Sequence, residues 1–175
     1  MGNGRSGFGE DALTFQEQRT RARQQAMQML FARDFACPVA EGDAGEDDSK
    51  DGVDEVKASI AEVMDDVVPE PYAYELYEGI EEHREQIDNV IEAASENWKL
   101  SRMPSTDRSI LRIAVFELLY RDDIPTGVSI NEAVELAQDY GGEDDSYKFV
   151  NGVLGNVASR VEDEKQGQRS QDSAE

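Results

Sequence analysis

The most apolar stretch of the chain is the segment Ser105–Tyr120. Within Ile110–Leu119, every residue except Arg112 and Glu117 is apolar. A helix on a protein surface carries its apolar residues as one stripe, whereas a helix that is apolar nearly all round lies inside a core. This pattern therefore predicts that residues 105–120 form the central helix of an all-helical domain.

Six further segments show the spacing of amphipathic helices. They cover Leu13–Phe35, Asp54–Val68, Tyr72–His83, Glu85–Trp98, a segment that opens at Ser129, and Tyr147–Arg160. Thr14 with Glu17, and Ser129 with Glu132, have the spacing of capping boxes at helix starts. We expect Trp98 to anchor the core or its edge. No segment competes with the period of a β-strand, so the predicted fold is all-α, a single-domain bundle of about seven helices.

The polar segments divide the chain into three parts. Residues 1–12 are rich in glycine and predict a disordered arm, residues 13–160 form the helical domain, and residues 161–175 predict a disordered polar tail. Inside the domain, residues 40–53 contain six acidic residues against one lysine and show no periodicity. We expect this segment to be an exposed acidic loop.

Composition excludes several classes of function. Cys37 is the only cysteine and His83 the only histidine, so an internal disulfide and the usual zinc sites are excluded. The chain shows no catalytic constellation and no cofactor motif, and we expect it not to be an enzyme. It also lacks a run of about 20 apolar residues and the apolar core of a signal peptide. These observations predict a soluble cytoplasmic protein.

The formal net charge of −22 argues against a general attraction of the surface to nucleic acid. Residues 14–33 are an exception, because they contain four arginines and one glutamate. Arginine binds phosphate through two parallel hydrogen bonds and stacks on bases. On a helix, Arg19 and Arg23 point about 40° apart, whereas Arg21 points about 160° from Arg23. The segment predicts either an RNA contact or an ordinary solvated helix face.

The last predicted helix has two contrasting faces. Its core face is formed by Val150, Val153, Leu154 and Val157. Lys148, Gly152 and Gly155 lie on the opposite side, although glycine inside a helix costs about 1 kcal/mol relative to alanine. A strip without side chains allows close approach of a phosphate or of another helix. Phe149 and Asn151 lie at the edges, where Phe149 either packs under a neighbouring helix or stacks on a base.

Four segments of the chain resemble the NusB family of bacterial transcription antitermination factors. They are RTRARQQAMQMLF, SILRIAVFELLYRDDIP, SINEAVELAQDYG and KFVNGVLGNVA, and the resemblance spans about Arg19–Ala158. It implies an all-α fold of seven helices. It also implies that the protein binds boxA RNA in nascent ribosomal transcripts together with the ribosomal protein NusE, and helps the RNA polymerase elongation complex to resist termination.

The resemblance also assigns roles to individual residues. The residues that it places at the RNA are Arg19, Arg21, Arg23, Lys148, Phe149 and Asn151. It places Asp107 on the surface that faces NusE. Asp145 matches an aspartate near the RNA surface, and we group it with Asp107 as a partner-binding residue. The segment GGEDDSYKF is one residue longer than the common family form, so Asp144 is the alternative match.

Two other hypotheses remain at this stage. The first is an interaction or assembly module with weak RNA binding, in which a homodimer covers the arginines. The second is a stand-alone relative of the NusB-like domain that occurs in RNA methyltransferases. The chain carries no methyl-donor domain of its own, so the second hypothesis does not make this chain an enzyme.

Overall fold

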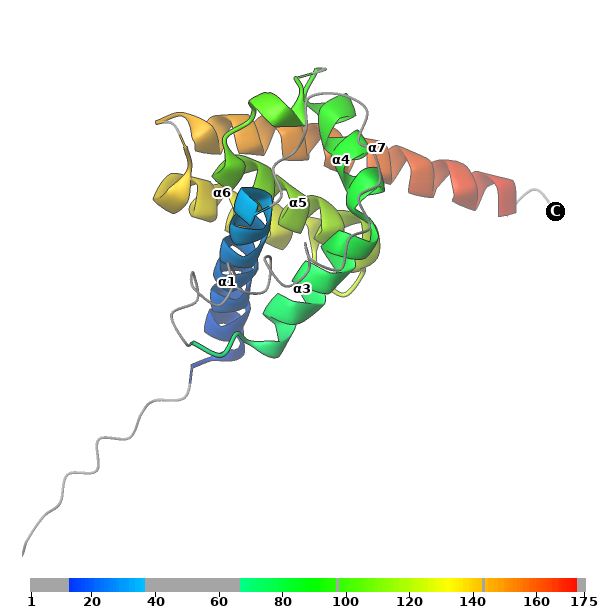
Figure 1. Ribbon diagram of the computed structural model, residues 1–175. Helices are drawn as coiled ribbons and strands as arrows, with labels where there is room; N and C mark the ends of the chain where they lie inside the picture. Colours follow the sequence, from blue (N-terminus) through cyan, green and yellow to red (C-terminus); the bar gives the residue numbers. More distant parts are fainter. Residues whose placement is uncertain (1–12, 37–66, 97, 143, 173–175) are drawn as a thin grey trace, which may run out of the picture.

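The computed structural model describes residues 13–36, 67–96, 98–142 and 144–172 (Figure 1). Its elements are α1 (Phe15–Ala36), α3 (Pro71–Glu82), α4 (Arg84–Ala94), the 3-10 turn η1 (Leu100–Arg102), α5 (Ser105–Tyr120), α6 (Thr126–Tyr140) and α7 (Ser146–Asp172). These residues contain no strand, which confirms the all-α class. The predicted arm 1–12, the acidic loop 40–53 and residues 54–66 of the predicted second helix lie outside the described residues. Val67 and Val68 are described and are not helical.

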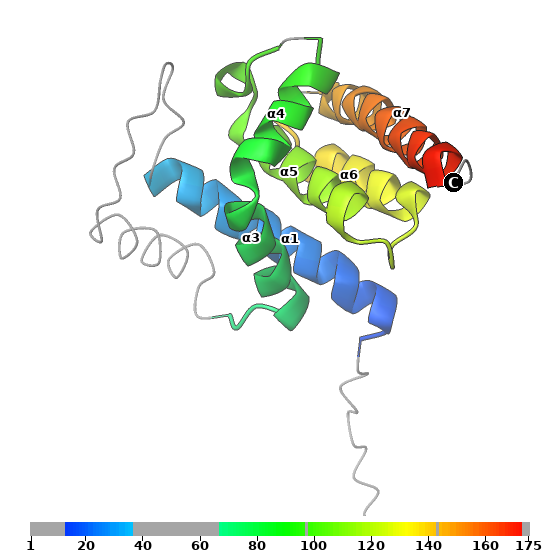
Figure 2. The same cartoon turned by 90° about the vertical axis from the view of Figure 1, so that its right-hand side faces the viewer.

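Helix α5 is the centre of the domain, as its sequence predicts. It contacts each of the other five α-helices, and all residues from Asp107 to Leu118 are buried. In Figure 2, α5 lies between the α1 and α3 pair on one side and α7 on the other. The helices α5, α6 and α7 also pack against one another. A helix that is surrounded in this way needs apolar residues on every side.

The buried charges of α5 hold the neighbouring helices in register. The carboxylate of Asp34 in α1 accepts hydrogen bonds from Arg108 Nε and Arg112 Nη1, both at 2.8 Å. Arg112 also donates to both oxygens of Asp88 in α4, at 2.7 and 2.9 Å. Burial alone would raise the pKa of Asp34, but the guanidiniums of Arg112, Arg108 and Arg84 together lower it. The pairs therefore fix α1 against Arg108 and Arg112 of α5, and α4 against Arg112.

Of the two predicted capping boxes, only the first is present. Thr14 N donates to Glu17 Oε2 at 2.7 Å, and Glu17 N donates to Thr14 Oγ1 at 3.3 Å. The second prediction is wrong because α6 starts earlier, at Thr126, directly after a proline. Ser129 is buried inside the helix and donates its hydroxyl hydrogen to Glu117 Oε2 at 2.6 Å.

Two helix ends also differ from the prediction. Helix α4 ends at Ala94, so Trp98 lies in the connection that leads to η1. Helix α7 continues to Asp172, and the prediction of a disordered tail is wrong for residues 161–172. Figure 1 shows the C-terminal half of α7 projecting beyond the other helices. Lys165 Nζ lies 3.0 Å from Asp122 Oδ1, which attaches this projection to the end of α5.

Candidate nucleic-acid interface

The three candidate arginines of α1 lie in three different environments. Arg21 is exposed and makes no hydrogen bond or ion pair with another described side chain. Arg19 is half-buried. Arg23 is 3% exposed, its Nε lies 2.8 Å from Glu117 Oε1, and its Nη1 lies 3.4 Å from Glu132 Oε2. The expectation that Arg23 contacts RNA is therefore corrected, because its guanidinium is used inside the protein.

Arg19 lies over an aromatic ring that three arginines share. Its guanidinium carbon is 3.7 Å from the centre of the Tyr72 ring, and those of Arg121 and Arg23 are 4.9 and 5.9 Å away. Burial raises the pKa of the Tyr72 phenol, and the charge of Glu117 raises it further. The ring thus stays neutral and offers its face to the cations. This stacking holds the side chain of Arg19 against α3, the helix that contains Tyr72.

The outer face of α7 carries the bare strip that its sequence predicts. Val150, Val153, Leu154 and Val157 are at most 4% exposed and form the core face. Gly152 and Gly155 are exposed on the other side, and a Cβ at either would meet no atom within 4 Å. The described helices therefore do not pack on this strip, which contradicts the reading of the glycines as a tight helix–helix contact.

The other candidates on α7 surround this strip. Asn151 is exposed. Lys148 is also exposed, and its Nζ lies 2.8 Å from Asp145 Oδ1. The hydrogen bond to Asp145 raises the pKa of Lys148, so the ammonium is charged at neutral pH. Since both partners face solvent, this ion pair is weak and leaves Lys148 available to a phosphate.

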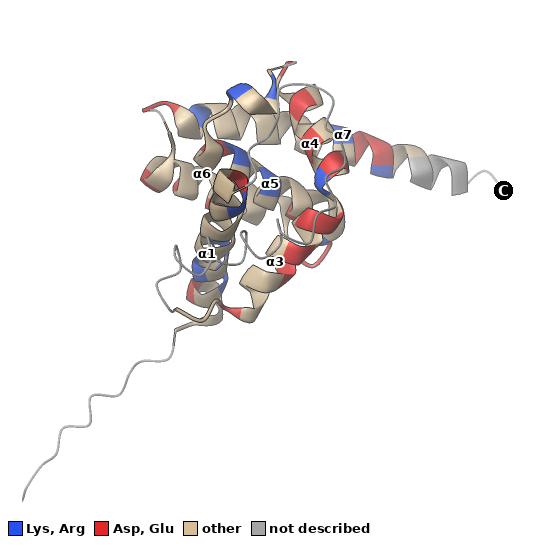
Figure 3. Cartoon of the chain, viewed as in Figure 1, with Lys and Arg blue, Asp and Glu red and all other residues tan. Residues whose placement is uncertain are grey.

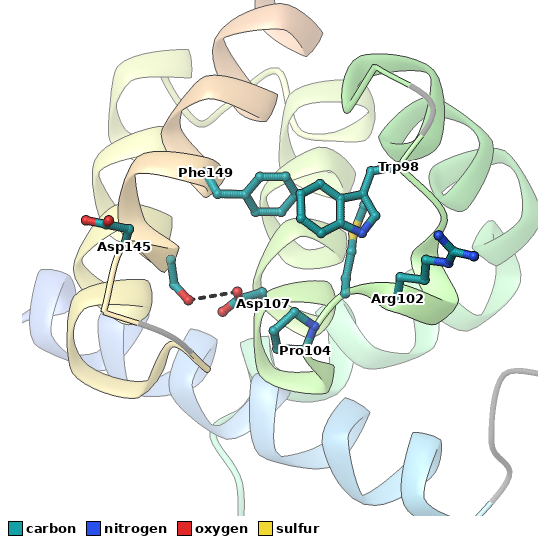
Figure 4. Close-up of a pocket in the computed structure, with 8 residues that line it drawn as sticks. Trp98, Arg102, Pro104, Asp107, Asp145 and Phe149 are labelled. Atoms are coloured by element: carbon teal, nitrogen blue, oxygen red, sulfur yellow. Dashed lines mark hydrogen bonds between the residues drawn. The ribbon is translucent and has the colours of Figure 1, made fainter.

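Phe149 lies at the edge of α7 and contacts Trp98. The centres of the two rings are 5.6 Å apart, and their planes are tilted by 58°. Trp98 is 53% exposed, so it lies at the edge of the core and not within it. Together the two rings border a cavity of about 240 Å³, shown in Figure 4. The residues that line it are Trp98, Arg102, Met103, Pro104, Asp107, Asp145, Ser146 and Phe149.

Asp107 lies at the bottom of this cavity and has a structural role. It is only 2% exposed. Its Oδ1 accepts a hydrogen bond from Gly142 N at 3.2 Å, and its Oδ2 accepts one from Ser146 Oγ at 2.8 Å (Figure 4). The expectation that Asp107 faces a partner on the surface is corrected, because the carboxylate ties the connection between α6 and α7 to the start of α5. Asp145, by contrast, is exposed and accessible to a partner protein.

Asp145 and its neighbour Asp144 lie beside different depressions of the surface. Both aspartates are exposed, but Asp145 pairs with Lys148 and lines the cavity beside Phe149. Asp144 borders a separate depression with Tyr147 at the end of α6. The geometry therefore associates Asp145 with the other candidate residues.

Sequence reasoning missed Arg102 and gave Trp98 no functional role. Both lie in the connection between α4 and α5, where helical periodicity gives no information about side-chain direction. Arg102 is exposed and makes no ion pair with any residue of the described ranges. An arginine and an aromatic residue just before a proline were the only signals in the sequence.

Helices α3 and α4 are rich in acidic residues. In the ribbon of Figure 3, acidic positions are coloured along α3 and α4, and α3 contains four glutamates and no lysine or arginine. A field of this sign repels a polyanion, so α3 and α4 do not favour RNA contact.

Within the described ranges, no group of carboxylate, imidazole or thiol side chains could hold a metal ion. Of the helices described, none has the length and apolar character needed to cross a membrane.

Comparisons with known proteins show clear similarity over most of the chain. The model of the NusB family matches residues 20–159. The transcription antitermination protein NusB of Geobacter sulfurreducens is 41% identical over 151 residues, which cover 83% of this chain and 96% of that protein. The protein of the same name from Bacillus subtilis is 39% identical over 144 residues, which cover 82% of this chain and 97% of that protein.

Solved structures show the same similarity. NusB of T. maritima has a TM-score of 0.63 and 32% sequence identity, over 81% of this chain and 90% of that chain. A crystal structure of the antitermination factors NusB and NusE in complex with double-stranded RNA contains a chain with a TM-score of 0.61 and 25% identity, over 84% of this chain and 99% of that chain.

Proposed function

Because the chain belongs to the NusB family, we propose that it is a transcription antitermination factor that binds boxA-type RNA together with NusE. It acts in the cytoplasm on nascent ribosomal transcripts, as a binding factor and not as an enzyme. In the complex, it helps the RNA polymerase elongation complex to resist termination. Relatives with about 40% sequence identity are named transcription antitermination protein NusB.

The proposal that the protein binds RNA rests mainly on the open face at the N-terminal half of α7. There, the charged Lys148 and the exposed Asn151 lie beside a strip that no side chain covers. An RNA backbone can approach such a strip closely, while the ammonium neutralises a phosphate. Phe149 supplies an aromatic ring at the edge of the same face, as single-stranded RNA sites commonly do.

The arginines of α1 extend this face. Gln24, three residues after Arg21, donates a hydrogen bond to the hydroxyl of Tyr140 at the end of α6. The end of α6 leads directly into α7 through Gly141 and Gly142. The end of α6 therefore lies between α1 and the start of α7. One RNA strand that passes the end of α6 can reach both Arg21 and the open face of α7. In this proposal Arg21 binds a phosphate, and Arg19 contributes from its position over Tyr72.

NusE is the proposed protein partner, and Asp145 is the residue that we assign to that contact. Its carboxylate is exposed, whereas Asp107 acts indirectly by holding the connection on which Asp145 lies.

The alternative function, an assembly module, predicts a dimer whose interface covers the arginines. Light scattering at several protein concentrations, with and without RNA, distinguishes the two.

The main experiment is a titration of labelled boxA RNA with the full chain, in the presence and absence of NusE. It is carried out at one stated salt concentration, because phosphate-driven affinity falls steeply with salt. We expect NusE to increase the affinity for boxA RNA more than for a scrambled RNA of the same length. If the scrambled RNA binds equally well with NusE present, the proposed specificity is wrong.

A further inference from the structure

We propose that the cavity between η1 and α7 binds one unpaired nucleobase of the RNA, which stacks on Trp98 while Arg102 holds an adjoining phosphate. Figure 4 shows the two aromatic rings and Arg102 around the same space. This inference rests on the proposed RNA-binding function and adds two residues to it. Neither Trp98 nor Arg102 belongs to the segments that carry the family resemblance.

The shape of the cavity fits a flat aromatic ligand. Its volume is about 240 Å³, and a cavity of roughly 150 Å³ in another protein already accommodates benzene. The rings of Trp98 and Phe149 are tilted by 58°, so they are not stacked face to face. More than half of the Trp98 side chain is exposed. A face of the indole is therefore available for stacking, which any base can provide.

Charge favours a nucleotide over an apolar peptide side chain. Arg102 is exposed at the rim of the cavity, and its guanidinium has no carboxylate partner in the described part of the chain. Lys148 is a second cation close to the cavity, because its Nζ lies 2.8 Å from Oδ1 of Asp145, which lines it. Two cations beside an aromatic site suit a base and the phosphates that flank it.

The cavity is formed before any ligand arrives. Met103, which is 4% exposed, is part of its lining. The connection between α6 and α7 is held on one side by the hydrogen bonds of Asp107. On the other side it packs tightly, because a Cβ at Gly142 would lie 2.5 Å from Pro104 Cβ. A site that is already ordered loses less conformational entropy on binding.

The test uses the fact that Trp98 is the only tryptophan of the chain. The full chain with NusE is titrated with boxA RNA and with a series of RNAs that each lack one base. Fluorescence anisotropy of the labelled RNA reports binding, and tryptophan emission reports stacking, with the emission of NusE alone subtracted. We expect RNA to quench the emission of Trp98, and we expect removal of one particular base to abolish the quenching.

Substitutions separate stacking from charge. Trp98→Ala is expected to weaken RNA binding by about 5- to 150-fold, as for the loss of one base–aromatic stack, and Trp98→Phe is expected to retain most of the affinity. Arg102→Ala is expected to reduce the salt dependence by about 0.7 in the slope of log K against log salt, as for one lost phosphate contact on a single strand. Tyr74→Ala on the acidic helix α3 is the aromatic control, and its affinity should be unchanged. Circular dichroism verifies that each variant folds.

The outcomes distinguish this inference from the proposed function. If boxA RNA binds specifically but Trp98→Ala binds with the wild-type affinity, or no missing base affects the emission, the base site is wrong and the proposed function stands. If NusE without RNA quenches the emission of Trp98, the cavity is a protein contact and the inference is also overturned. If the wild-type chain with NusE binds no RNA, both proposals fail together.

Discussion

Arg23 and Glu117 form an ion pair that is almost completely shielded from water. Nε of Arg23 lies 2.8 Å from Oε1 of Glu117, and the two side chains are 4% and 0% exposed. Glu117 also accepts hydrogen bonds from the hydroxyls of Tyr72 and Ser129. One carboxylate of α5 therefore connects α1, α3 and α6.

Removal of Arg23 should destabilise the fold. Arg23→Ala leaves the carboxylate of Glu117 buried without its cation, which costs about 3–5 kcal/mol. We expect a loss of this size in the free energy of unfolding, measured in urea by circular dichroism. An unfolding midpoint equal to that of the wild type would show that the pair contributes nothing. The structure thus gives Arg23 a role in stability, whereas the family resemblance implies a contact with RNA.

Arg21→Ala is the matched substitution on the same helix. Because Arg21 is exposed and has no charged partner among the residues that the structure describes, we expect its loss to change the free energy of unfolding by less than about 0.5 kcal/mol. RNA affinity should fall, and the slope of log K against log salt should decrease by about 0.7 for one lost phosphate contact. The measurement is an anisotropy titration at several salt concentrations. An unchanged slope would remove Arg21 from the interface.

The Asp34 cluster predicts a dependence of stability on acid. The pKa of Asp34 is lowered in the folded protein, since three guanidiniums outweigh the effect of burial. The unfolded chain, with an aspartate pKa of about 3.9, takes up the proton first. The stabilisation by Asp34 is therefore present above about pH 4 and is lost as the pH falls through the folded pKa.

Asp34→Asn tests this dependence in urea unfolding at pH 7 and at pH 3.5. We expect the variant to be clearly less stable than the wild type at pH 7, because the buried arginines lose their counter-charge. The difference should shrink at pH 3.5. Asp139→Asn, at an exposed position of α6, should behave as the wild type at both values. A difference that stays constant with pH would contradict the role of the Asp34 charge.

Two glycines in helices should respond to alanine in opposite ways. Gly155→Ala places a Cβ in open space, so we expect it to stabilise the fold by about 0.5–1 kcal/mol. Gly79→Ala places a Cβ 2.4 Å from Phe116 Cζ, so the ring has to move, at a cost of about 1–3 kcal/mol. Thermal unfolding measures both. Destabilisation by Gly155→Ala would mean that the strip is not open in the folded protein.

Substitutions of Asp107 in α5 and of Asp145, just before α7, should separate stability from partner binding. Asp107→Asn replaces one of two accepting oxygens by a donor, and we expect it to cost about 1–3 kcal/mol of stability. Asp145→Asn changes an exposed side chain and should stay within about 0.5 kcal/mol. If Asp145 contacts NusE, its substitution should lower NusE affinity in calorimetric titration. Equal stability losses in both variants would contradict this division.

Local pattern alone determined most of the helical framework. The apolar run at residues 105–120 predicted the bounds of α5, because a helix that is apolar on all sides is stable only when others surround it. The period of the valines in α7 predicted its core face, and the spacing of Thr14 and Glu17 predicted the start of α1. The length of α7 was missed, although its last residues include good helix formers such as Glu, Lys and Gln.

Only the tertiary structure decided what the polar residues do. Arg23 and Glu117 are separated by 94 residues, and Asp107 and Ser146 by 39. Periodicity shows which side of a helix a residue occupies, but it does not show whether a polar side chain meets a partner across the core or meets water. The same reason explains why Trp98 and Arg102 became candidates only when the chain brought them beside Phe149. A buried charge is stable only with its partner, and that partner is chosen by the packing of the helices.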